Sequence, residues 1–429
     1  MDSTSDNIDR LSCLHEEVLS HILSLMPTKF AVRTSILSKR WRYHWTLVNN
    51  LDFDDVHPVH GLNCFTNFVN RVLALCKTSH INLFRLHCSE IWVRKVSLSK
   101  WINEAVRLNV RELDIQVILL HLPLPLSMFN CKTLTKLRIV WGTHDWDVWE
   151  FPSSVKLPCL KVLEISVFSK PSINAFRLIS GCPILESLSL DVDYPNEEED
   201  YKFNIPTLKR LKLRTRKSII LNKVVLNVPN LEYLFVGGVV SSLFVMEDLS
   251  SLVEATATVS VFDERFNHLK LDLLKGISGA KSISWSTSTV DVPLNSSVPK
   301  FPNLKHLELK SSFSSGWLSL FQFLESASEL EHLCIEEREE SCWIEPQSVP
   351  TCLLSNLRTM KITRCKGRKC DIKFLKYMLG NAEVLKTLTI TCENVPLKEE
   401  MCAELLKFPR ASRCCEIHFI GNGSYSAGN

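Results

Sequence analysis

LTKLRI at residues 134–139 is a short motif that recurs along most of this 429-residue chain. Each copy runs leucine, two variable residues, leucine or methionine, one variable residue and an apolar residue. The fourth position is occupied in turn by Leu137, Leu163, Leu188, Leu211, Leu234, Leu307, Leu333, Met360 and Leu388. An earlier copy, VRELDI, has Leu113 there. Because apolar and variable residues alternate, each copy predicts a short strand with one buried face.

The copies are spaced by 23 to 28 residues, apart from one interval of 73 residues between Leu234 and Leu307. That interval is close to three periods, so we expect degenerate copies near LVEATATV and AKSISW. A fixed period in the twenties is the signature of leucine-rich repeats, in which each repeat adds a parallel strand to a curved solenoid. Unrelated amphipathic strands would not recur nine times at regular spacing. The predicted fold class is therefore α/β, with a solenoid over residues 80–339.

The first fifty residues predict a small helical module. Apolar residues at helical spacing indicate a first helix between residues 16 and 26, which Pro27 ends because proline cannot continue a helix interior. TKFAVRTSILSKRW, residues 28–41, predicts a second short helix.

A third helix is expected over residues 39–48, where Trp41 and Trp45 lie four apart and share one helical face. A module of this size buries too little surface to be stable by itself. We therefore expect it to pack on the solenoid and to cap one end of the sheet.

At these residues the chain resembles a known family. DRLSCLHEEVLSHILSLMPTKFAVRTSILSKRWRYHW, residues 9–45, resembles the F-box of plant F-box proteins, which binds the Skp-type adaptor of a cullin-based ubiquitin ligase. The resemblance assigns the F-box to residues 7–53. It implies that the adaptor-facing surface is formed or supported by Leu14, His15, Val18, Leu19, Ile22, Pro27, Val32, Ile36, Leu37 and Trp41.

One position departs from the F-box pattern. His15 stands where the family has a proline, which would preset the turn into the first helix. We expect this difference to reduce the affinity for the adaptor.

Alternation along the strands also predicts which side chains face the concave surface of the solenoid. In RLKLR these are Arg210, Lys212 and Arg214, and in the next repeat they are Tyr233 and Phe235. Three cations beside two aromatic rings form a candidate client-binding site for an acidic or phosphorylated segment. Two alternatives remain open, a solvated strand and a nuclear-import tract, since KRLKLRTRK has six basic residues in nine.

Residues 340–420 have a different pattern, which predicts a strand, a basic turn, a helix and a strand, followed by a helix, a turn and a strand. They resemble the FBD domain found at the end of many plant F-box proteins, including the Phe-Pro-Arg-Ala-Ser turn at residues 408–412. We expect this FBD-like segment to continue and cap the solenoid. Residues 421–429 are predicted to be a disordered tail.

Composition excludes several classes of function. The formal net charge of +3 makes nucleic acid an unexpected partner, and no apolar run is long enough to span a membrane. Sixteen scattered cysteines without a signal sequence indicate reduced thiols in the cytoplasm or nucleus. No Cys-x-x-Cys pair, glycine-rich phosphate loop or nucleophile signature occurs. We therefore expect no cofactor, no metal and no catalytic residue.

The sequence thus predicts a noncatalytic substrate receptor of a ubiquitin ligase. The resemblance implies an F-box that binds the Skp-type adaptor and, through it, cullin, while the repeats hold an unknown protein client. Two other classes stay open. One is an adaptor-binding protein that assembles no active ligase, and the other is a repeat protein that binds nucleic acid or a small ligand through its basic strand.

Overall fold

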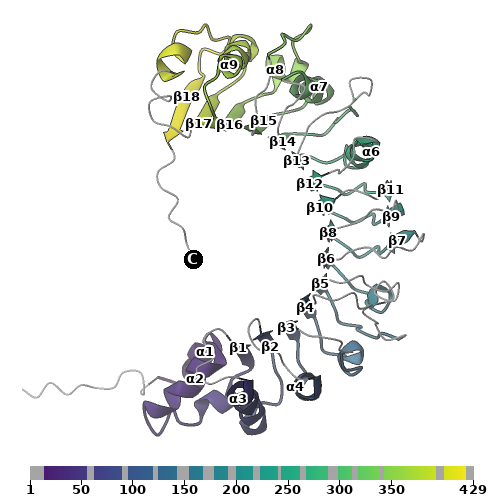
Figure 1. The fold of residues 1–429 in the computed structure, drawn as a ribbon, viewed down its shortest axis with the longest axis vertical. Coiled ribbons are helices and arrows are strands. Elements are labelled where there is room, and N and C mark those ends of the chain that lie inside the picture. Colours follow the sequence, from purple (N-terminus) through teal and green to yellow (C-terminus); the bar gives the residue numbers. More distant parts are fainter. Residues whose placement is uncertain are drawn as a thin grey trace, which may run out of the picture. The chain divides into compact units, whose positions relative to one another are not determined.

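The chain forms two compact units, residues 1–195 and 196–429, each of which is described by itself. In both units parallel strands form a sheet that carries helices on one face (Figure 1). The opposite face, which we call the open face, bears no helix in the described residues. A computed structural model describes residues 14–55, 62–88, 95–118, 124–142, 154–167, 178–191, 200–215, 223–239, 243–260, 267–287, 298–311, 317–337, 343–392 and 401–421.

The N-terminal unit starts with four short helices and continues as strands and helices. The short helices are α1 (Glu16–Ser24), α2 (Thr28–Arg33) and the 3-10 helices η1 (Thr34–Ile36) and η2 (His44–Leu47). The following elements are β1 (Asn50–Asp54), α3 (Leu62–Leu75), β2 (Leu83–Cys88), α4 (Lys95–Arg107), β3 (Glu112–Ile118), η3 (Met128–Asn130), β4 (Lys136–Gly142), β5 (Val162–Val167) and β6 (Ser187–Asp191). Strands β1 to β6 pair in parallel and in sequence order.

The register of this sheet confirms the repeat. Leu113 pairs with Leu137, and the same row continues to Leu163 and Leu188, all of which are buried. In the other direction the row extends to Phe84 and Leu51. Two further repeats therefore precede the first recognisable motif, and the earliest strand, β1, lies in the segment predicted to end the F-box.

The predicted third helix over residues 39–48 is wrong. This segment forms turns followed by the 3-10 helix η2. His44, Trp45 and Thr46 are all buried, and three successive buried residues cannot lie on a single face of an α-helix. Both tryptophans of this segment are nevertheless buried, with Trp41 4% and Trp45 9% exposed, so they belong to the core of the module.

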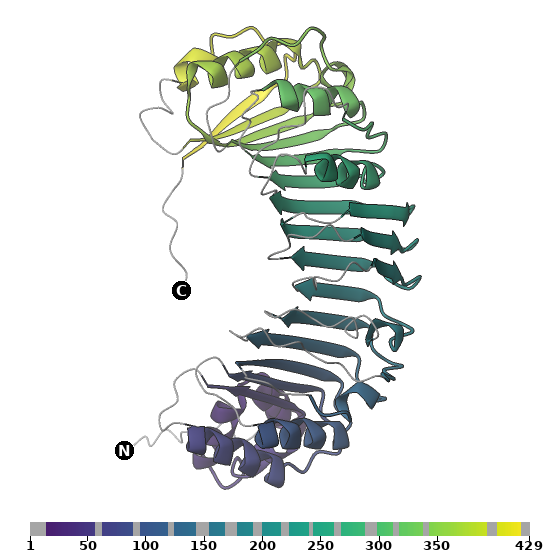
Figure 2. The ribbon, with the colours of Figure 1, turned by 45° about the vertical axis from the view of Figure 1, so that its right-hand side comes forward.

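The C-terminal unit contains two sheets. Its elements are β7 (Tyr201–Asn204), β8 (Arg210–Thr215), β9 (Lys223–Asn227), β10 (Tyr233–Val239), β11 (Leu243–Asp248), β12 (Glu254–Ser260), α6 (Asn267–Gly276), β13 (Ser282–Thr287), β14 (His306–Ser311), α7 (Leu318–Ser326), β15 (His332–Glu337), α8 (Thr351–Ser355), β16 (Thr359–Cys365), α9 (Lys369–Asn381), β17 (Thr387–Cys392) and β18 (Glu416–Gly421). The larger sheet runs in parallel from β8 through β10 and β12 to β18 (Figure 2).

The two degenerate copies expected in the long interval are present. Leu234 on β10 pairs with Ala255 on β12, which pairs with Ile283 on β13 and so with Leu307 on β14. Each of these residues is buried. Within the described residues, this interval therefore adds two strands to the larger sheet, with alanine and isoleucine in place of the leucine.

A second parallel sheet, in the order β11-β9-β7, was not predicted. Its strands alternate in sequence with β8 and β10, and helix α6 contacts β11. The repeats here are the shortest in the chain, and extended segments such as KVVLN are rich in β-branched residues, which favour strands. Strands therefore replace helices as the covering layer of this part of the unit.

The C-terminal segment continues the repeat as predicted. Strands β16, β17 and β18 pair in parallel, and helix α9 lies between the first two along the chain. The turn at residues 408–412 is fastened to α9, because Ala411 donates its backbone N–H to the Leu379 carbonyl at 2.9 Å. Gly421 ends β18 and is not part of a tail, and the remaining predicted tail lies outside the described residues.

Candidate functional site

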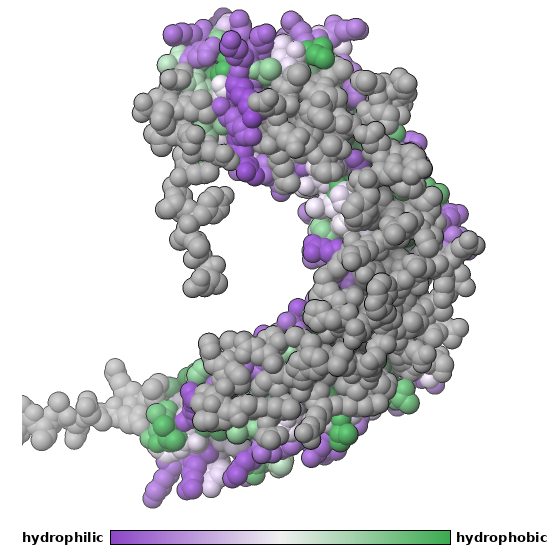
Figure 3. Space-filling view, in the orientation of Figure 1, coloured by the Kyte–Doolittle hydropathy of each residue, from purple (hydrophilic) through white to green (hydrophobic). Residues whose placement is uncertain are grey.

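The N-terminal helices present a group of exposed apolar side chains. Ile36 is 86% exposed and Leu37 61%, at the point where η1 ends. Leu25, just after α1, is 73% exposed. Figure 3 shows hydrophobic surface at this end of the unit. We call this group the apolar patch, and its members are Val18, Leu25, Phe30, Ile36 and Leu37.

The predicted adaptor residues include only part of the apolar patch. Val18, Ile36, Leu37, Pro27 and His15 are exposed as an adaptor surface requires, and Leu14, Ile22 and Val32 are half-buried. Leu25 and Phe30, which are also exposed, were not among the predicted residues.

Two residues of the set predicted to form or support the adaptor surface lie in the core. Leu19 is fully buried and Trp41 is 4% exposed, so neither side chain can reach a partner. They support the surface from below, together with Leu23 and Ala31.

His15 has the backbone conformation that proline would impose. It is the N-cap residue of α1, with φ −63° and ψ 149°, and its carbonyl accepts the Leu19 N–H at 3.1 Å. Proline fixes φ near −65°, so the chain reaches the same geometry without it. The departure at His15 therefore leaves the start of α1 correctly shaped.

The helical module is joined to the first strand of the sheet by hydrogen bonds. Thr28, which is buried, accepts the Asp52 N–H from β1 at 2.7 Å through its Oγ1 atom. Asn50 Nδ2 donates to the Ser24 carbonyl at 3.1 Å. Since an uncovered edge strand leaves its backbone groups unpaired, these contacts cap the edge at β1, as the sequence predicts.

The five predicted client residues come together on the open face of the C-terminal unit. Arg210, Lys212 and Arg214 are exposed on β8, while the residues between them are buried. The parallel register sets Tyr233 beside Arg210 and Phe235 beside Lys212. We call these five residues the cationic strip.

The cations of the strip lie over the rings of the neighbouring strand. Arg210 Cζ and Lys212 Nζ are each 6.0 Å from the centroid of the Tyr233 ring, and Arg214 Cζ is 5.5 Å from that of Phe235. These distances are typical of cation–π interactions. Such interactions order the long side chains but leave their positive charge in place.

Two glycines make this arrangement fit. A Cβ atom at Gly237 would lie 2.6 Å from the Phe235 ring, so only glycine leaves room for the ring there. Gly238 has φ +93°, which glycine adopts readily, and a Cβ atom there would lie 1.7 Å from the Thr215 carbonyl oxygen.

No acidic side chain of the described residues comes within 4.0 Å of the three cations of the strip. Other cations of the same open face have carboxylate neighbours, such as Lys310 with Glu308 at 2.9 Å. Glu254 on β12 stands in register with Tyr233, beyond the rings. The strip therefore carries three positive charges without an acidic partner in this part of the chain.

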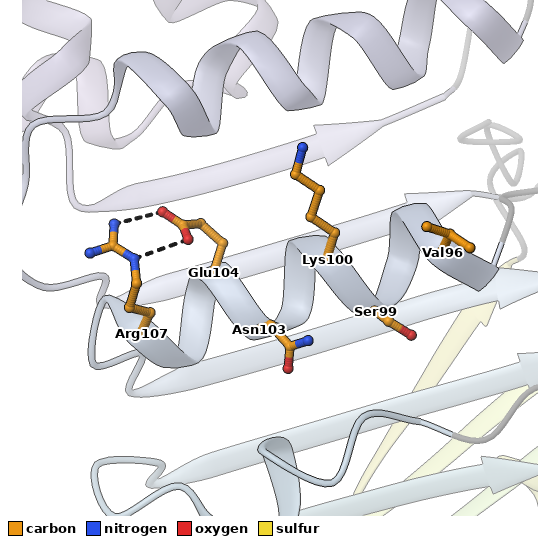
Figure 4. Close-up of a pocket in the computed structure, with 6 residues that line it drawn as sticks. All are labelled: Val96, Ser99, Lys100, Asn103, Glu104 and Arg107. Carbon is orange, nitrogen blue, oxygen red and sulfur yellow. Dashed lines mark hydrogen bonds and ion pairs between the residues drawn. The ribbon is translucent and has the colours of Figure 1, made fainter.

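A pocket on helix α4 carries no comparable chemistry. The residues that line it, drawn in Figure 4, all come from one side of α4: Val96, Ser99, Lys100, Asn103, Glu104 and Arg107. Glu104 accepts two hydrogen bonds from Arg107, at 2.6 and 3.0 Å, and this contact lowers the pKa of the carboxyl. The carboxylate is thus used within the helix.

The described residues contain no cluster of three or more histidine, cysteine or acidic side chains that could hold a metal ion. Burial raises the pKa of the Cys182 and Cys352 thiols to about 12, which keeps them protonated and unreactive. None of the described helices combines the length and apolar character needed to cross a membrane. Of the tryptophan-rich segment WGTHDWDVWE, residues 141–150, the part from 143 to 150 lies outside the described residues.

Fold and surfaces together define a leucine-rich-repeat protein with a helical docking module at its first strand. Comparison with known families agrees. Residues 11–53 match the F-box domain, residues 98–247 match the leucine-rich repeats of FBD-associated F-box protein At5g56370, and residues 345–390 match FBD.

Similar proteins from Arabidopsis thaliana extend over nearly the whole chain. The F-box/FBD/LRR-repeat protein At4g26340 is 31% identical over 96% of this chain and 100% of its own length. The F-box/LRR-repeat protein At4g14096 is 33% identical over 96% of this chain and 95% of its own. The chain therefore belongs to the plant F-box/FBD/LRR-repeat family, and its F-box implies binding to a Skp-type adaptor.

Proposed function

We propose that this protein is the substrate-recognition subunit of a Skp-cullin-F-box ubiquitin ligase. The F-box binds the adaptor and through it cullin, and the open face of the repeats binds a protein client. The protein itself is noncatalytic. It accelerates ubiquitin transfer by raising the effective concentration of the client near the loaded conjugating enzyme.

The observation that carries this proposal is the apolar patch, which lies on a helical module with a buried core of its own. Ile36 and Leu37 are large apolar residues that the fold leaves in water, although hydrophobic side chains nearby are fully buried. Several large apolar side chains exposed on one small helical module favour a protein interface. Burial of both side chains against a partner would contribute about 3 kcal/mol or more.

A binding assay with purified Skp-type adaptor tests the adaptor arm. The double substitution Ile36→Asp and Leu37→Asp is expected to weaken binding at least a hundredfold, because it places two charges in the buried interface. Val96→Asp is the matched control, since Val96 is 79% exposed on α4 of the same unit and should leave binding unchanged. Equal binding by wild type and the double variant would contradict the proposal.

The adaptor affinity of His15→Pro, compared with that of wild type, tests whether His15 weakens the F-box. Because His15 already has φ −63°, this variant should bind the adaptor no more than a few times more tightly than wild type. Adaptor binding that appears only in the proline variant would identify a protein with an impaired F-box.

Assembly with cullin is a separate arm of the same test. The adaptor-bound protein is expected to co-elute with cullin and to support ubiquitin transfer to a bound client. Adaptor binding without cullin assembly would identify an adaptor-binding protein outside the ligase and would overturn the proposal.

A further inference from the structure

We infer that the cationic strip binds an extended acidic segment of the client, with carboxylates at alternate residues. This inference rests on the proposed function and states the chemistry of the client. It is carried by the arrangement of Arg210, Lys212 and Arg214 with the Tyr233 and Phe235 rings.

The spacing of the cations favours an extended ligand. Arg210, Lys212 and Arg214 are alternate residues of one strand and project on the same face. Alternate residues of a strand are about 6.4–6.8 Å apart. An extended peptide repeats its side chains at the same interval, so acidic residues at every second position can meet the three cations one to one.

The rings prepare the cations for binding. Arg210 and Lys212 share the Tyr233 ring, and Arg214 lies over Phe235, so each long side chain is held before the ligand arrives. Side chains that are already ordered lose less conformational entropy on binding. Gly237 preserves this order because any side chain there would displace the Phe235 ring.

Charge provides the attraction. The three cations have no acidic partner within 4.0 Å in the described residues. Neighbouring cations of the strip are closer together than the Debye length, so they repel one another. An acidic ligand removes that repulsion and adds charge-assisted hydrogen bonds.

The geometry favours a peptide over single-stranded nucleic acid. Proteins that bind single strands stack bases on exposed aromatic faces. Here Tyr233 and Phe235 have cations over their rings, so a base could stack on those faces only by displacing them. The net charge of +3 also provides no general attraction for a polyanion.

Fluorescence anisotropy with the full chain tests the inference. One labelled peptide carries three glutamates at alternate positions, and the other has the same composition with the glutamates contiguous. We expect the alternating peptide to bind at least about threefold more tightly, because only it can pair all three carboxylates with cations. Equal affinities would overturn the proposed register.

Substitution of the strip provides the second readout. Arg210→Ala, Lys212→Ala and Arg214→Ala together should weaken the alternating peptide about thirtyfold, on the basis of about threefold for each exposed pair. Lys202→Ala is the control for the loss of one surface cation outside the strip, since Lys202 is exposed on β7 of the other sheet, and it should leave the affinity unchanged. An unchanged affinity in the triple variant would overturn the inference.

Further arms exclude other occupants. Tighter binding of a peptide with one phosphoserine, or of an oligonucleotide of equal charge, would assign the strip to another ligand and overturn the inference. The chain also contains its own acidic run at residues 197–200, three glutamates followed by an aspartate. Replacement of these glutamates by glutamine should leave peptide affinity unchanged, and a marked rise would show that the run competes for the strip.

The adaptor assay is run on the same variants. Retained adaptor binding with lost peptide binding confirms the strip independently of the F-box. If the peptides fail to bind while the ligase assembles, only this inference fails.

Discussion

Arg138 in the N-terminal unit and Arg214 in the C-terminal unit both project from a strand onto an open face, yet their surroundings differ. Arg138 lies between two carboxylates, 2.9 Å from Asp114 and 3.6 Å from Glu164 on the adjacent strands. Arg214 lies over the Phe235 ring and has no carboxylate within 4.0 Å in the described residues.

The difference extends beyond these two residues. In the N-terminal unit Arg85 pairs with Asp52, and His87 Nε2 lies 3.2 Å from Asp114, so charges alternate across the strands in a ladder. The charges of such a ladder pair with one another across the strands, so they mainly stabilise the sheet. The cations of the strip have no such ion pairs in the described residues, and this contrast is the reason why we propose that they bind a ligand.

The largest effect is expected where the backbone frame of the strip is broken. Gly238→Ala should lower the free energy of unfolding by at least about 2 kcal/mol, because φ +93° and a contact of 1.7 Å with Thr215 exclude a Cβ atom. Hydrogen exchange of the β8 and β10 amides reports the loss. Gly237→Ala is the control with a smaller effect, since there the Phe235 side chain can move. Equal protection in Gly238→Ala and wild type would contradict this account.

Breaking the ladder should have the next largest effect. Asp114→Ala leaves Arg138 with a single, longer contact and should destabilise the N-terminal unit by about 1–3 kcal/mol, measured by urea unfolding and exchange of β2 to β4.

The same residue makes the ladder sensitive to acid. Burial opposes the charge of Asp114, but His87 and Arg138 outweigh it and lower the pKa below 3.8. Its contribution is therefore fully present above about pH 4 and is lost as pH falls through the lowered value. The alanine variant should lack this component of the acid dependence, and parallel pH curves would refute the role of Asp114.

A stacked pair of histidines on the open face of the C-terminal unit adds a pH-dependent case to this comparison. His306 and His332 stack on the open face with ring centroids 4.4 Å apart, and His332 Nδ1 lies 2.6 Å from Thr359 Oγ1. Burial and the neighbouring His306 lower the pKa of His332 below 6.5, with Lys305 and Arg358 assisting and Glu331 opposing.

The folded state therefore binds fewer protons at His332 than the unfolded state. Its stabilisation is present above about pH 6.5 and is lost as pH falls. Exchange of the β14 and β15 amides, corrected for intrinsic rates, should accelerate between pH 7.5 and 5.5. His332→Gln should remove this component, and an undiminished pH response in that variant would rule out His332 as its source.

The smallest effect is expected for the strip charges themselves. Lys212→Ala should change the free energy of unfolding by less than about 0.5 kcal/mol, because the exposed charge has no acidic partner in the described residues to lose. Urea unfolding provides the measurement. A loss comparable with that of Asp114→Ala would mean that the strip is structural and would remove the contrast between the two faces.

Sequence reasoning located the strip because alternation along a strand is strictly local. It identified Arg210, Lys212 and Arg214 as neighbours on one face, and Tyr233 and Phe235 from the next repeat. It assigned Leu19 and Trp41 to the set that forms or supports the adaptor surface without separating the two roles, since a family motif does not distinguish a contacting side chain from a supporting one. It missed β1 and β2 because Val48 and Ile81 replace the first leucine of the motif in these repeats, and Phe84 replaces the second leucine in β2.

The sequence by itself determined the repeat, the parallel strands and the F-box, because period, alternation and short motifs are written along the chain. Only the tertiary structure decided which charges are neutralised, since Arg138 meets Asp114 and Glu164 across neighbouring repeats. It also decided that strands replace helices around β7, β9 and β11, and that residues 44–46 are all buried in a 3-10 helix. These outcomes depend on which surfaces meet in space, and packing across repeats is not encoded in the spacing of any one of them.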